Sequence, residues 1–478
     1  MKNTRLIKLL ETFSKAEMRE FSDYVESPFY NKNKNVANLF KVIGSYYPGF
    51  DSKQFTEDKL YKKLFKGEKY DYFKSKNIIS DLYRLGMDYL RIKHQGNTFD
   101  SDLTFIMELR QRNLLSHYES EYKKIEKKHL ETKVKEEEFF LNDLRMSAEK
   151  SYYNFLLKPN TGFDHAQDQL NSLLTFTLIR FLKLYTLMVY ETKQNNVGYD
   201  LKFMEEIENY ITAHDDEKNP TFLLYKHILL LELYRKEEDY FKIKEIHSNH
   251  LKELTEKDRY MSYIHRGGYC AFVFNIKGEK SFLNEMLQVH KGMLGENFFS
   301  SYGMAYPDFV NFVKIGVLNG EFEYVNEFIE RYKSKLSESE YTNCLNYSEA
   351  YIAFHKGDKL PALELLSRTN FNNFILKIQV KILQIQIYSE LGMYEQLLSA
   401  IDTCRHYLRS EGYITELYKT TISDFLTLAN DITLMIVDPI RGNDDLKKRE
   451  LAKKVTNLPS NVFGVKMWLQ DRAAKVLY

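Results

Sequence analysis

The chain has 478 residues, more than one ordinary hydrophobic core supports, so we expect two or three domains or one elongated array. Hydrophobic residues make up 44% and charged residues 28%, with only 20 Gly and 8 Pro. This composition favours long helices and argues against a loop-rich β protein. The net charge is only +1.

The charge is unevenly distributed along the chain. Residues 1–95 carry 19 Lys/Arg and 12 Asp/Glu, residues 96–440 carry 40 and 51, and residues 441–478 carry 9 and 4. A basic N-terminal segment could contact nucleic acid or an acidic protein. An excess of this size is also common on a surface that is merely solvated.

The three cysteines indicate a reducing compartment. They are far apart and odd in number, without C-x-x-C spacing, and we expect buried thiols. They are Cys270, Cys344 and Cys404. The most apolar stretch, residues 173–190, is interrupted by Arg180 and Lys183, which predicts a buried helix and not a membrane span. No signal peptide is evident at the N-terminus, so we expect a soluble cytoplasmic protein.

Residues 1–95 predict a small all-α head domain of four helices. The first stretch contains an S-x-x-E capping box at Ser14 and Glu17 and ends at Ser27-Pro28. The second, VANLFKVIGSYY, stops before Pro48-Gly49. The third follows a capping residue at Thr56, and the fourth covers residues 72–93.

The third and fourth helices have the order of a helix-turn-helix DNA reader, a short helix followed by a longer one. On the longer helix, Lys74, Asn77 and Arg84 lie away from the apolar face and are candidate nucleic-acid contacts. Asp81 would face the phosphates, and no Gly-rich hairpin follows the helix as a wing. DNA binding is therefore the alternative interpretation.

Residues 96–220 predict a densely charged helical middle region with Glu and Lys at i,i+4 spacing. Breaks are expected at residues 158–160, 193–200 and 215–220. No alternating β pattern of any length occurs between them.

Residues 221–430 contain a repeated pattern. Gly278, Gly320, Gly357 and Gly392 each follow one amphipathic run and precede another, at separations of 42, 37 and 35 residues. Such a period predicts stacked helix pairs, with each glycine in a left-handed cap between two helices. Residues 232–246 resemble one more copy in which the glycine is replaced.

These copies resemble tetratricopeptide repeats. In the best copy small residues flank Gly357 at Ala350 and Ala362, and in the next copy Tyr388 stands four residues before Gly392. The resemblance is degenerate: it covers residues 264–410 loosely and 346–369 most closely. It implies an α-solenoid of helix pairs. The segments SPFYNKN and LYKKLF also resemble uncharacterised bacterial proteins of the Bacteroidetes type, which implies no activity.

The last segment, residues 431–478, predicts capping helices that close the array. Four residues of its final helix are expected to face inward. They are Val465, Trp468, Leu469 and Val476.

No motif in the chain predicts catalysis, a cofactor or a metal site. Phosphate-binding glycine loops and nucleophile elbows are absent, and the pair Gly267-Gly268 lies in a helical pattern, where small residues let helices approach closely. His247 and His250, with His265 downstream, lack further ligands at metal-binding spacing. An enzyme with dispersed catalytic residues remains a third possibility.

We therefore expect a non-catalytic scaffold or adaptor that binds a protein or peptide on the concave face of its repeats. If the tetratricopeptide register holds, five side chains line that face. They are Lys314, Tyr347, Tyr351, Gln379 and Gln386. The alternative is a DNA-associated transcriptional regulator with a helix-turn-helix-like head and a repeat array that senses a partner.

Overall fold

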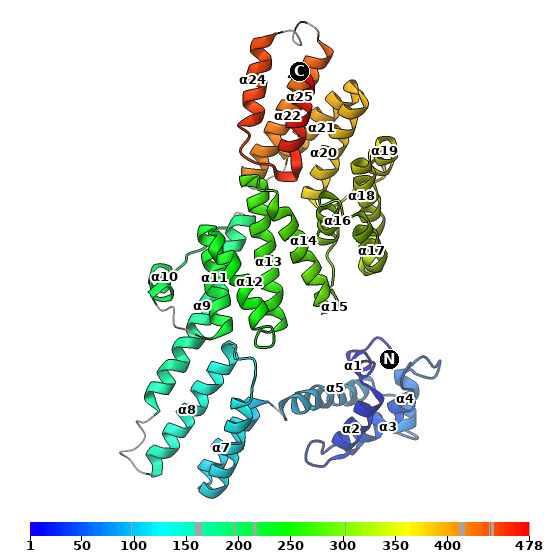
Figure 1. Cartoon of the computed structure of the whole chain (residues 1–478). Helices are drawn as coiled ribbons and strands as arrows, with labels where there is room; N and C mark the ends of the chain where they lie inside the picture. The colour runs from blue at the N-terminus through cyan, green and yellow to red at the C-terminus, as the bar shows by residue number, and fades with distance from the viewer. Residues whose placement is uncertain are drawn as a thin grey trace. The chain divides into compact units, whose positions relative to one another are not determined.

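The structure is a computed structural model that describes residues 1–477 except 97, 158–164, 196, 214–217, 302, 411–415, 439 and 441–443. The regular elements in these ranges are helices, without any strand, so the predicted all-α class is confirmed (Figure 1). The chain forms two compact units, Met1–Glu131 with Met146–Asp164, and Thr132–Arg145 with His165–Tyr478. The four segments expected from the sequence, with boundaries after residues 95, 220 and 430, stay predictions.

The first unit begins with the head helices and continues into part of α8. Its helices are α1 (Arg5–Leu10), α2 (Lys15–Glu26), α3 (Lys34–Gly44), α4 (Glu57–Leu64), α5 (Tyr72–Gln95), α6 (Phe99–Gln111), α7 (Leu115–Leu130) and α8 (Glu137–Leu157), the last of which extends into both units. Within residues 1–96, whose backbone the structure describes throughout, there are five helices where the sequence predicts four.

The additional helix results from the capping box at Ser14, which separates α1 from α2. The hydroxyl of Ser14 accepts a hydrogen bond from the Glu17 N–H at 3.2 Å, and the Glu17 carboxylate accepts one from the Ser14 N–H at 2.8 Å. The capping-box prediction is thus confirmed, and α2 ends at Glu26, before Ser27-Pro28. Thr56 occupies the N-cap position of α4, but its side chain makes no capping hydrogen bond.

The second unit contains the remaining helices. They are α9 (Ala166–Asn195), α10 (Met204–Ala213), α11 (Pro220–Tyr234), α12 (Glu237–Asn249), α13 (Glu256–Phe272), η1 (Val273–Lys277), α14 (Ser281–Gly295), α15 (Phe298–Ser301), α16 (Tyr306–Leu318), α17 (Phe322–Tyr332), η2 (Lys333–Lys335), α18 (Glu338–Lys356), α19 (Lys359–Ser367), α20 (Phe374–Leu391), α21 (Tyr394–Ser410), α22 (Glu416–Val437), α24 (Asp445–Thr456), η3 (Val462–Gly464) and α25 (Val465–Leu477). The breaks predicted at residues 158–160 and 215–217 lie outside the described residues.

In the second unit each helix packs mainly on its neighbours along the chain. The helices of a pair contact each other, as in α13 with α14, α16 with α17, and α18 with α19. The first helix of one pair also contacts the first helix of the next, as in α16 with α18 and α18 with α20. Helix α20 is buried on two sides, because Val380 and Leu383 pack toward α18 while Ile378 and Ile382 pack toward α21 and α22.

The four glycines of the repeated pattern all adopt the left-handed conformation that the sequence predicts. The φ angles of Gly278, Gly320, Gly357 and Gly392 are 76°, 76°, 98° and 70°. Glycine is the residue that reaches this region without steric cost. In the copy without a glycine, Arg235 takes the same role at the end of α11, with φ of 53°.

Helix α9 contains the apolar stretch that the sequence singles out. Among the described residues, Ala166–Lys193 is the one helix long and apolar enough to cross a membrane, which is weak evidence taken alone. Its Ile179 and Leu182 are fully buried against other helices of the second unit. The interrupting charges are paired, Arg180 with Glu137 at 2.9 Å and Lys183 with Asp258 at 3.4 Å.

The C-terminal helices pack as the sequence predicts where they are described. Val465 and Leu469 are buried, and Trp468 is half-buried against the same core as Phe425. The side chain of Val476 lies outside the described residues. The three cysteines are free and buried, which confirms their predicted burial.

Candidate functional site

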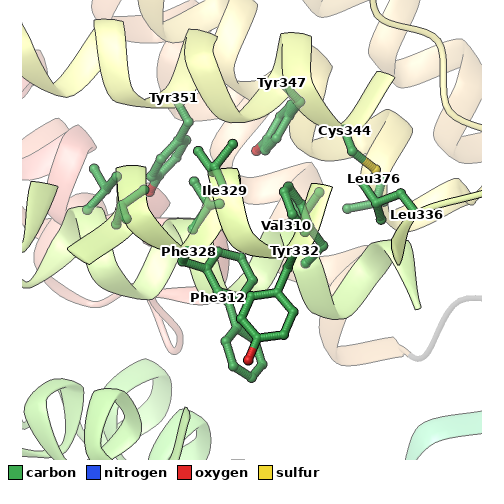
Figure 2. Packing of buried hydrophobic residues seen from close by; sticks show 14 of the residues in the cluster. Val310, Phe312, Phe328, Ile329, Tyr332, Leu336, Cys344, Tyr347, Tyr351 and Leu376 are labelled. Carbon is green, nitrogen blue, oxygen red and sulfur yellow. The ribbon is translucent and has the colours of Figure 1, made fainter. Parts of the chain in front are cut away.

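The five residues predicted for the concave face lie on the three consecutive first helices α16, α18 and α20. All four tyrosines and glutamines of this set are buried, with exposed fractions of 1% for Tyr347, 8% for Tyr351, 5% for Gln379 and 7% for Gln386, and Tyr347 and Gln386 do not line the cavity described below. Figure 2 shows Tyr347 and Tyr351 projecting from one helix into the packed layer that contains Ile329. The other three, Lys314, Tyr351 and Gln379, line one cavity.

This cavity, of about 370 Å³, lies inside the second unit. Its walls come from α13, η1, α14, α16, α18, α20, α22 and η3, with one residue of α9. Much of the wall is aromatic. The rings are Tyr190, Tyr263, Phe274, Phe312, Tyr351, Tyr418 and Phe463. Near this wall the C-terminal segment joins η1, because the Asn461 N–H donates to the Asn275 carbonyl at 2.6 Å.

Lys314 provides the cationic group of the cavity. Its ammonium donates to Oε1 of Gln379 at 2.5 Å and lies 5.7 Å from the ring centroids of both Tyr351 and Phe463. Within the part of the chain that the structure describes, no carboxylate is in ion-pair distance of this ammonium. Burial lowers the pKa of Lys314 to about 8, because a desolvated ammonium is less stable than a hydrated one.

Gln379 is held in place from the opposite side. Its Oε1 also accepts a hydrogen bond from the Tyr347 hydroxyl at 3.4 Å. Tyr347 therefore acts behind the wall of the cavity, as support for Gln379, and does not line the space itself.

Asp308 lies on the same helix as Lys314, at the N-terminal end of the lining stretch. The two residues are six positions apart, which is about 9 Å along a helix axis. Burial raises the pKa of Asp308, and no described cation pairs with its carboxyl group. The cavity thus holds one cationic and one acidic group that do not neutralise each other.

His290 contributes a polar atom without a partner. Its ring stacks on Phe312 with centroids 4.0 Å apart and planes inclined by 6°. Its Nδ1 is buried and makes no hydrogen bond. Burial lowers the pKa of His290 to about 3, so the imidazole is neutral at physiological pH.

The glycine pair of α13 has a different role from the predicted one. A Cβ atom on Gly268 would meet no atom within 4 Å, and one on Gly267 would lie 3.6 Å from Val289, an ordinary contact. Neither glycine is needed for close helix approach. Both line the cavity, and Gly268 leaves part of it open.

Sequence reasoning missed Asp308, His290, Gly268 and Phe463 as cavity residues. They are drawn from about two hundred positions of the chain and share no motif, so only the packing of the helices brings them together. One signal was available: in α16 the residues at 308, 311, 315 and 318 follow the spacing of one helix face.

The candidate nucleic-acid residues on α5 are partly engaged within the head. Lys74 pairs with Glu68 at 2.7 Å and lies 3.8 Å from the ring centroid of Phe65. Arg84 pairs with Asp81 at 3.0 Å, while Asn77 is exposed.

The three histidines considered for metal binding each contact a different glutamate, which for His250 is Glu253 at 2.9 Å. His247 contacts Glu296 at 2.9 Å and His265 contacts Glu232 at 2.9 Å. Among the described residues, no group of three or more His, Cys, Asp or Glu is placed to hold a metal ion.

Comparisons with protein-family models, with curated proteins and with solved structures find no match for this chain.

Proposed function

We propose that this protein is a non-catalytic scaffold or adaptor that binds a protein or peptide on the inner face of a tetratricopeptide-like helical array. The array would be an α-solenoid formed by the helix pairs from α11 to α21 and closed by the C-terminal helices. We further infer that the protein is soluble and cytoplasmic.

One observation carries the proposal. Lys314, Tyr351 and Gln379, which come from three consecutive first helices, converge on a single cavity. In helical repeat arrays, first helices line the concave surface, and side chains from successive repeats act together on one partner. The convergence supports the same arrangement here.

The left-handed turns are a second, weaker support. Gly320, Gly357 and Gly392 each join an inner helix to an outer one, and the outer helices α17, α19 and α21 present exposed polar residues. The outer face is therefore merely solvated, whereas the inner face holds polar groups that are not compensated. Such an inner face is better suited to recognition of a partner.

The DNA-associated alternative has less support in the head. Lys74 and Arg84 are each paired with a neighbouring carboxylate, and phosphates would have to compete with these pairs. We keep it as the alternative that the experiment must separate.

The experiment is to tag the full chain in its native cell and purify it with and without nuclease. Two matched variants place a lysine on the inner helix, Asn311→Lys, or on the outer helix, Asn326→Lys, at positions that are both exposed. We expect a stoichiometric protein that survives nuclease, is lost with Asn311→Lys and is kept with Asn326→Lys. Loss of all binding partners on nuclease treatment would favour the DNA alternative.

A further inference from the structure

We propose that the cavity around Lys314 binds a small organic monoanion, a carboxylate joined to an apolar and preferably aromatic body. Such a site needs no protein partner, so it goes beyond the scaffold function. Four features of the lining carry it, and each specifies a different part of the ligand.

The first feature is the ammonium of Lys314, which calls for an anion. A buried charge is normally paired, because removal from water is costly unless an opposite charge replaces the lost hydration. Lys314 has one amide oxygen and two ring faces but no described carboxylate. An ammonium can donate three hydrogen bonds, and Gln379 is the one hydrogen-bond acceptor recorded for it in the described chain.

The second feature is the small number of charged groups in the lining, which limits the ligand to a single negative charge. Lys314 is the one Lys or Arg among the described residues that line the cavity. Asp308, at the N-terminal end of the α16 lining stretch, repels a second negative charge when its carboxyl group is ionised. A carboxylate fits this balance better than a phosphate dianion, which proteins bind with several cations or backbone N–H groups.

The third feature is the aromatic wall, which calls for an apolar body. The rings of Phe274, Phe312, Tyr418 and Phe463 face the same space as Lys314. A volume of about 370 Å³ lies within the range of small-molecule sites. It corresponds to about a dozen water molecules at ~30 Å³ each, enough for a ligand with roughly a dozen non-hydrogen atoms.

The fourth feature is the His290 ring, which lines the cavity and calls for a flat group in the ligand. It stacks on Phe312 with centroids 4.0 Å apart, so its orientation is fixed. Its Nδ1 has almost no accessible surface, so the ring meets a ligand through its carbon surface and not through this nitrogen.

The test is calorimetric titration of the full chain with three probes that share one body. They are 4-phenylbutyrate, the neutral 4-phenylbutanamide and the dianionic 4-phenylbutyl phosphate. We expect the carboxylate to bind about tenfold or more tightly than the other two, the size of one charge-assisted hydrogen-bonded contact. Equal binding of carboxylate and amide, or no binding of any probe, would overturn the proposal.

Variants assign the effect to Lys314. Lys314→Met should remove the preference for carboxylate over amide, Lys314→Arg should retain part of it, and the exposed Lys419→Met on α22 should leave it unchanged. Gly268→Leu should weaken the carboxylate and the amide alike, because its side chain would enter the open space, while Gly268→Ala should not. A preference that persists in folded Lys314→Met would contradict the assignment.

A final comparison distinguishes two sources of the carboxylate, a free small acid and an acidic group on a protein partner. The acetylated tripeptide Gly-Gly-Phe with a free carboxyl end presents the same chemistry on a peptide. Tighter binding of the peptide than of 4-phenylbutyrate would assign the anion to a partner chain and overturn the small-ligand proposal. The scaffold proposal is tested separately by the purification described above, and it fails if no protein co-purifies.

Discussion

The ammonium of Lys314 and the amide oxygen of Gln379 meet at 2.5 Å although the two residues are 65 positions apart. They belong to α16 and α20, and both helices contact α18, which lies between them in the array. The bond therefore joins the inner helices of the first and third of three successive pairs, on either side of α18. This relationship underlies both the scaffold proposal and the carboxylate site.

Substitution by alanine at two glycines in helix interiors should change the free energy of unfolding in opposite directions. A Cβ on Gly316 would lie 2.4 Å from Cγ2 of the buried Val325, so Gly316→Ala should lower the free energy of unfolding by about 1–3 kcal/mol. Gly268→Ala meets no atom within 4 Å and should raise it by up to about 1 kcal/mol through helix propensity. Urea denaturation of both variants measures the difference, and equal changes would contradict the packing described for α16 and α17.

The left-handed turn at Gly357 predicts that any side chain at this position destabilises the folded protein. Its φ of 98° lies in the left-handed region, so Gly357→Ala should destabilise the protein by about 1–2 kcal/mol. Gly295, the last residue of α14, has open space around it and no such φ, and Gly295→Ala is the matched control. A neutral Gly357→Ala would show that this turn is not left-handed in solution.

His290 predicts that stability declines in acid. Burial lowers its folded-state pKa to about 3, against an ordinary value near 6.5, so the unfolded chain binds more protons between these values. The stability that neutral His290 contributes is complete above about pH 6.5. It is lost as the pH falls toward 3, at up to about 1.4 kcal/mol per pH unit.

His290→Phe preserves a ring against Phe312 and removes the titrating group. We expect its free energy of unfolding to depend less on pH than that of the unsubstituted chain between pH 4 and 6. The difference in slope should correspond to at most one bound proton, or ~1.4 kcal/mol per pH unit. His406→Phe changes an exposed histidine in the same unit and serves as the control. Parallel pH profiles for the unsubstituted chain and His290→Phe would mean that His290 is hydrated.

If the scaffold proposal holds, we expect the head domain to bind DNA only weakly and without sequence specificity. The triple variant Lys74→Ala, Asn77→Ala, Arg84→Ala should change the affinity for duplex DNA by less than about threefold, since two of the three side chains are already paired. Fluorescence anisotropy at several salt concentrations measures it. A large loss of affinity together with a steep salt dependence would support the DNA-associated alternative.

The local elements were largely predictable from sequence, because their signals are local. Ser14 with Glu17 predicted a helix start, and Gly357 predicted a left-handed cap; both are observed. The cavity was only partly predictable. The repeat register placed Lys314, Tyr351 and Gln379 on inner helices, where they line the cavity, but it also included Tyr347 and Gln386, which do not line it. His290 and Phe463 join the site only through packing between distant helices, which no local pattern encodes.

The most direct test of the scaffold proposal is site-specific photo-cross-linking in the native cell. Benzoylphenylalanine at position 311, on the cavity side of α16, is compared with the same residue at position 326, on the outer helix α17. We predict that one protein partner is captured from position 311 and little or none from position 326. Equal capture from both positions, or capture from position 326 alone, would contradict recognition on the inner face.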